Sequence, residues 1–153
     1  MICFKSAYPK VSIVSGTTEE DKQHIDFKIR HREERTFDVK SIKSHQINRC
    51  DENGKLLTNY TIVELINDKF YQGWIFSDRT DFIAFQSGTS ENFIFLCVDR
   101  EQLRIYVKKN VMMKTVESLP DAVNILYSRG NDIMTVVDME FLRYLPNSFI
   151  VRK

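Results

Sequence analysis

The sequence predicts a mixed α/β or α+β fold in which a largely antiparallel central sheet is flanked by helices. Segments 25–30 and 36–42 alternate apolar and charged residues, which is typical of half-buried strands. Segment 99–109 begins with Asp99, a good helix cap, and then carries apolar residues at helical spacing. Five Gly and three Pro residues predict long regular elements with few extended loops. We therefore expect residues 1–153 to form one domain.

Composition excludes several classes of protein. The net charge of +1 gives the chain no overall attraction to a polyanion, so any nucleic-acid site must be local. The longest apolar run, 93–98, is too short to span a membrane, and the N-terminus lacks the apolar stretch of a secretory signal. The three cysteines are too widely spaced for a zinc site or a disulfide framework. We expect a soluble, cytoplasmic protein with free thiols and no membrane partner.

The first forty residues predict two strands joined as a hairpin and preceded by a short helix. Residues 11–15 predict a short strand. Thr17 and Glu20 have the spacing of a capping box, which indicates a brief helix. The alternating segments 25–30 and 36–42 then form the hairpin.

The remaining elements follow in order along the chain. Strands are expected at 60–65, 70–76 and 81–85 as a meander, then at 93–98 as a buried strand, followed by the helix 99–109. Further along, the sequence predicts a helix over 119–127 starting near Pro120, a strand over 133–137, a helix over 138–145 capped by Asp138, and an edge strand over 148–151.

Three charged residues on the hairpin form the strongest candidate site. Within a strand, the period of two places Asp38 and Lys40 on one face. If the hairpin register has even parity, for example with Asp26 opposite Lys40 and Lys28 opposite Asp38, these charges share the face away from the apolar residues. Two carboxylates and one ammonium group would then converge.

Such a cluster suits a divalent metal and a phosphate. Carboxylate oxygens, with a main-chain carbonyl such as that of Val39, are ligands for Mg²⁺ or Mn²⁺, which keep several waters and accept phosphate oxygens. Lys40 would orient the attacking water or stabilise the charge that develops on a phosphodiester. The chemistry indicated is phosphodiester hydrolysis.

Asp26, followed after eleven residues by Asp38-Val39-Lys40, resembles the core of the PD-(D/E)XK nuclease superfamily. The resemblance covers roughly residues 10–110, and the segments 73–76 and 81–85 are similar to small phage and restriction-type members. It implies a restriction-endonuclease-like fold and a metal-dependent endonuclease acting on DNA. By position, Asp26 and Asp38 would bind the metal and Lys40 would be the catalytic lysine. An upstream acid, Glu20 or Asp21, would complete the site.

Local charge supports a polyanion partner, DNA or RNA. Between residues 28 and 49 there are seven Lys or Arg residues and three acids, a local charge of +4. The residues expected to contact phosphates are Lys28, Arg30, Arg32, Arg35, Lys43 and Arg49.

Other interpretations remain open at this stage. The alternating charges of the hairpin are also typical of a sheet face that is exposed to solvent and has no catalytic role. His24 is interpreted as a lone exposed histidine. A second functional class is a catalytically silent module of a phage or mobile element that binds nucleic acid or inhibits a protein. Cutting both strands with a single site would require a homodimer or two successive encounters.

Overall fold

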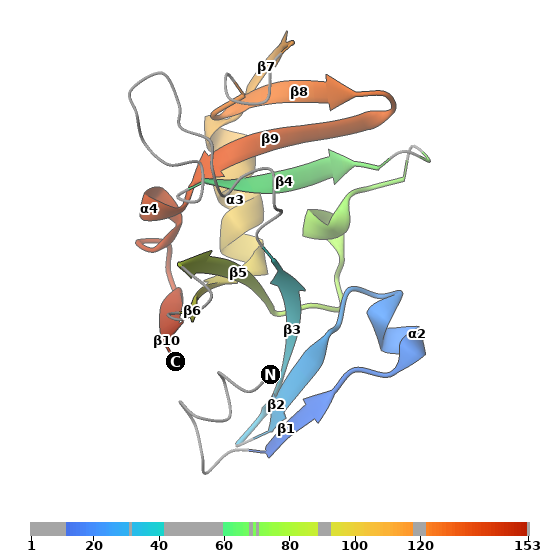
Figure 1. The fold of residues 1–153 in the computed structure, drawn as a ribbon, viewed down its shortest axis with the longest axis vertical. Coiled ribbons are helices and arrows are strands. Elements are labelled where there is room, and N and C mark those ends of the chain that lie inside the picture. Colours follow the sequence, from blue (N-terminus) through green and yellow to red (C-terminus); the bar gives the residue numbers. More distant parts are fainter. Residues whose placement is uncertain are drawn as a thin grey trace.

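A computed structural model describes residues 12–30, 32–41, 60–67, 69, 71–88, 93–117 and 122–152. The fold is mixed α+β and consists mostly of sheet, with the two sheets of Figure 1 arranged one above the other and α3 behind the strands of the four-stranded sheet. The six-stranded sheet has the order β1 (Ser12–Ser15), β2 (Phe27–Arg30), β3 (Glu34–Lys40), β5 (Phe82–Gly88), β6 (Phe93–Asp99) and β10 (Phe149–Arg152). The four-stranded sheet has the order β4 (Tyr60–Ile66), β9 (Asp132–Asp138), β8 (Ile125–Arg129) and β7 (Met112–Val116).

The N-terminal hairpin is confirmed, and the short helix before it, α2 (Thr18–Asp21), has the predicted capping box. β2 and β3 are antiparallel with even parity, but Lys28 lies opposite Thr36 and not opposite Asp38. Phe27 and Phe37 are cross-strand partners whose stacked rings lie 4.8 Å apart, and both are buried. Burial of these two rings selects this register.

The predicted meander over 60–85 is wrong. β4 belongs to the four-stranded sheet, whereas β5 pairs in parallel with β3 of the other sheet. In place of a strand over 70–76, the described part of this segment has one bridge at Gln72 and a 3₁₀ turn, η3 (Trp74–Phe76). Trp74 and Ile75 are both buried, and consecutive side chains of a strand would point to opposite faces. The turn lets both enter one core.

The C-terminal half departs from prediction at two elements. The part of 119–127 that the structure describes starts strand β8, not a helix, and β8 forms a hairpin with β9 around Gly130, whose φ is 61°. Strand β7, which carries mostly exposed side chains, was not predicted. The other elements are confirmed: α3 (Arg100–Asn110) capped by Asp99, strand β9, α4 (Met139–Leu142) capped by Asp138, and β10 at the sheet edge.

Two apolar clusters cover opposite faces of the six-stranded sheet. The larger, here the inter-sheet core, joins both sheets to α3, α4 and η3; its buried residues are Val63, Trp74, Ile75, Ile83, Phe85, Leu96, Val98, Leu103, Val107, Val137, Met139 and Leu142. The smaller contains Phe27, Phe37, Ala84, Cys97 and Val151. Phe37 of β3 belongs to the smaller cluster, whereas Asp38 lies beside Ile83 of the inter-sheet core, which sets the environment of this carboxylate. Within the described ranges, no helix has the length and apolar character needed to cross a bilayer.

Candidate active site

Asp38 is a buried carboxylate in the middle of the six-stranded sheet. Its residue is 3% exposed and lies beside Ile83 of the neighbouring strand β5. Its atom Oδ2 is buried and has no hydrogen-bond partner of good geometry, although Lys40 Nζ lies 2.8 Å away as an ion pair. Burial raises the pKa of Asp38 to about 6, and this effect outweighs the opposing effect of the Lys40 ammonium group. Asp38 is therefore not part of a solvated strand face.

Asp26 brings a second carboxylate to the same place. It lies just before β2, where its amide donates to the carbonyl oxygen of Phe37 at 2.8 Å. Its Oδ2 accepts a hydrogen bond from the amide of Val39 at 2.5 Å, which fixes the carboxylate against β3. The negative charge of Asp26 further raises the pKa of Asp38. Two like charges are thus held together, as a metal site or a shared proton requires.

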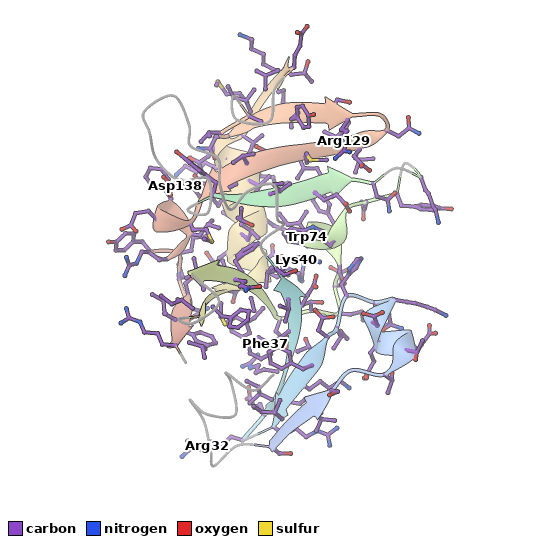
Figure 2. All side chains as sticks on the ribbon, viewed as in Figure 1. Arg32, Phe37, Lys40, Trp74, Arg129 and Asp138 are labelled. Carbon is purple, nitrogen blue, oxygen red and sulfur yellow. The ribbon has the colours of Figure 1, made fainter. Side chains whose placement is uncertain are left out.

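Lys40 lies between this carboxylate pair and an aromatic ring. Its Nζ is 4.9 Å from the centre of the Trp74 ring, and the two side chains are seen together in Figure 2. Trp74 is itself packed in the inter-sheet core against Phe85. The contact of Trp74 with Lys40 depends on η3 and was not predicted. The ring and the Asp38 carboxylate together restrain the ammonium group.

His24 is a member of the site that sequence reasoning did not select. Its Nδ1 lies 3.9 Å from Asp38 Oδ2, and its φ of 59° is unusual for a residue with a side chain. Partial burial, followed by the charge of Lys40, lowers the pKa of His24, while Asp26 and Asp21 act in the opposite direction. The feature of the sequence that could have selected His24 is its position two residues before Asp26.

The two candidate upstream acids have different positions. Glu20 completes the capping box with Thr17 and forms an ion pair with Lys28. Its hydrogen bond with Lys28, followed by that from the Thr17 amide, lowers the pKa of Glu20 to about 2. The described contacts of Glu20 therefore do not bring it to the carboxylate pair. Asp21, at the end of α2, acts electrostatically on His24 and is the better placed of the two.

Half of the six residues predicted to contact phosphate form ion pairs with acidic side chains. Lys28 pairs with Glu20 and Glu34, and Arg30 also pairs with Glu34. Arg35 pairs with Glu33 at 2.6 Å. Arg32 is exposed, and Lys43 and Arg49 lie outside the described residues. These pairs compensate much of the local positive charge that the sequence shows on the hairpin.

The carboxylate pair fits a hard divalent cation. Among the described residues, no group of three or more His, Cys, Asp or Glu side chains is arranged to hold a metal. Mg²⁺, however, is commonly held by one or two carboxylates, with waters and substrate phosphate as its other ligands. Asp26 and Asp38 would supply these two carboxylates; Oδ2 of Asp38 is ion-paired with Lys40 and accepts no hydrogen bond of good geometry. Val39 donates its amide to Asp26, and the predicted use of its carbonyl as a ligand stays a prediction.

Comparison with known proteins gives no relative for this arrangement: no protein-family model matches the chain, and no curated protein or solved structure shows significant similarity to it.

Proposed function

We propose that the protein is a metal-dependent endonuclease that hydrolyses phosphodiester bonds in DNA, on a restriction-endonuclease-like arrangement of strands. The observation that carries this proposal is the buried carboxylate of Asp38, which is ion-paired with Lys40 and lies beside the carboxylate of Asp26. The order of the elements supports it. A short acidic helix precedes an Asp at the start of one strand, and the Asp-x-Lys triplet lies on the next strand of a mixed sheet.

Each residue has a distinct part in the proposed reaction. Asp26 and Asp38 would hold Mg²⁺ or Mn²⁺, which supplies Lewis-acid stabilisation of the charge on the phosphate. Lys40, whose ammonium group lies 2.8 Å from Asp38 Oδ2, would donate a hydrogen bond to a phosphate oxygen or to the attacking water. The Trp74 ring, 4.9 Å from Nζ, would help to hold the ammonium group at the site.

The direct test is titration of Mn²⁺ by calorimetry, followed by incubation with supercoiled, linear and single-stranded DNA and with RNA. We expect the wild type to bind Mn²⁺ and to cleave DNA. Asp38→Asn should lose both properties, because it removes a ligand charge. Lys40→Met should lose cleavage and retain metal binding.

Asp78→Asn is the matched control, because it makes the same acid-to-amide change at a side chain that is 86% exposed. It should leave metal binding and cleavage unchanged. Absence of both Mn²⁺ binding and cleavage in the wild type would contradict the proposed function.

The second candidate is a catalytically silent module that binds nucleic acid or inhibits a protein. It is favoured by the 2.8 Å ion pair, which compensates the charge of Asp38 without a metal. Metal-independent binding of nucleic acid or of a protein, without cleavage under any divalent ion and retained in Asp38→Asn, would support it.

A further inference from the structure

Two hydroxyl groups from a distant segment hold the turn that leads to Asp26. Thr80 Oγ1 donates to the carbonyl oxygen of His24 at 2.6 Å, and Ser77 Oγ donates to that of Gln23 at 3.2 Å. These partners are 56 and 54 residues apart in the chain. Thr80 is 2% exposed, so its hydroxyl bond is made where water does not compete effectively.

The turn itself has a conformation that needs support. His24 lies in the left-handed region at φ 59°, which is sterically unfavourable for a residue with a Cβ. Its amide bonds to Asp21 O and the amide of Ile25 to Glu20 O, so the turn doubles back onto α2. This reversal delivers Asp26 to the edge of β3, where its carboxylate meets the Val39 amide.

Thr80 is in turn anchored to the longest helix of the described ranges. Its carbonyl oxygen accepts a hydrogen bond from Arg100 Nε at 2.7 Å, at the first residue of α3. The adjacent Asp81 accepts hydrogen bonds from both the amide and the hydroxyl of Thr36 on β3. The segment is therefore fixed to α3 and β3 independently of the turn that it holds.

We propose that Thr80 and Ser77 are positioning residues of the candidate active site: their hydroxyl bonds to the turn at residues 23–24 set the position of the Asp26 carboxylate against Val39 and Asp38. The catalytic consequence rests on the proposed function, but the positioning itself does not. Without the Thr80 hydroxyl, the His24 carbonyl loses its partner and the left-handed turn relaxes. Asp26 then moves away from the Val39 amide.

Four variants separate positioning from general loss of a buried hydroxyl. Thr80→Val removes the hydroxyl and keeps the shape, and Thr80→Ser restores the hydroxyl. Thr135→Val is the matched control, because Thr135 is fully buried and its hydroxyl also donates to backbone carbonyls, those of Ala122 and Ile125, in the other sheet. Ser77→Ala provides a milder test if Thr80→Val does not fold.

The first readout is hydrogen exchange of the Val39 amide by NMR. Loss of one hydrogen bond corresponds to about five- to tenfold faster exchange, which we expect in Thr80→Val and to a smaller extent in Ser77→Ala. The Thr36 amide, which donates to Asp81, should be unchanged and serves as an internal control. Thr80→Ser and Thr135→Val should exchange at Val39 like the wild type.

The second readout is Mn²⁺ affinity, which should fall about tenfold in Thr80→Val with a lower kcat and an unchanged KM for DNA. Unchanged Val39 exchange in Thr80→Val, or equal acceleration in Thr135→Val, would overturn the proposal. If the Val39 amide exchanges faster in Thr80→Val and the wild type neither binds Mn²⁺ nor cleaves DNA, the positioning role is supported and the proposed function is refuted.

Discussion

Asp38 makes the stability of the fold depend on pH in a sense opposite to that of an ordinary paired carboxylate. Burial raises its pKa from 3.8 to about 6, so the folded chain holds this proton more tightly than the unfolded chain does. The stabilising contribution of protonated Asp38 is present below about pH 4 and is lost as the pH rises through 6. The shift corresponds to about 3 kcal/mol.

We therefore expect Asp38→Asn to gain stability relative to wild type as the pH rises from 4 to 7. Urea unfolding of both proteins at several pH values measures this difference. His24 is present in both proteins, so its lowered pKa, which destabilises the fold as the pH falls below 6.5, acts on both curves. Parallel curves for the two proteins would show that Asp38 is ionised at the same pH in the folded and unfolded states.

The backbone of His24 provides a second prediction at the scale of one residue. Because its φ is 59°, glycine should be accommodated better than alanine at this position. We expect His24→Gly to be more stable than His24→Ala by about 1 kcal/mol, measured by urea unfolding. Equal stabilities, or a more stable alanine variant, would mean that the turn does not hold this conformation in solution.

The residues of the candidate site differ in how far the sequence could predict them. Asp26, Asp38 and Lys40 were predicted together, because strand periodicity and hairpin parity follow from the local alternation of residues. Burial of Asp38 was not predicted, since it depends on the core contributed by β5 and η3. His24 and Thr80 join the site through a left-handed turn and a contact between distant segments, which no local pattern encodes.

At the scale of elements, the cap of α3 is open to a direct test. One oxygen of Asp99 accepts from the amides of Glu101 and Gln102, and the other is 3.3 Å from the side-chain amide of Asn147. Asp99→Ala should cost about 1 kcal/mol in the free energy of unfolding, and Asp99→Asn should recover most of it. Urea unfolding checks both values, and equal losses in the two variants would contradict a capping role.

Elements with a local signal were predicted, and those that depend on the other sheet were not. The capping residues Thr17, Asp99 and Asp138 all begin helices as expected, because a cap acts within one turn of backbone. The strand predicted over 70–76 failed because adjacent Trp74 and Ile75 are both drawn into the inter-sheet core. The helix predicted over 119–127 is wrong in its described part, because Val123 and strand β8 pair with strand β9.

At the scale of the whole molecule, the two sheets share one apolar core. The sequence predicted one domain with a single sheet. It could not predict that β3 and β4 belong to different sheets, because no local pattern of residues indicates which sheet a strand joins. The inter-sheet core includes residues of β4 and β9 from one sheet and of β5 and β6 from the other. Leu103 and Val107 of α3 are buried within it, so α3 packs in the core that both sheets share.

This shared core predicts cooperative unfolding. Leu103→Ala should lower the free energy of unfolding by about 2–5 kcal/mol, because Leu103 is fully buried. Ile105→Ala, on the exposed side of the same helix, should change it by less than about 0.5 kcal/mol. Hydrogen exchange under mild denaturant should show amides of β5 and β9 losing protection together in Leu103→Ala. Separate loss in the two sheets would mean that α3 does not couple them, and that the carboxylate site on β3 can persist without the four-stranded sheet.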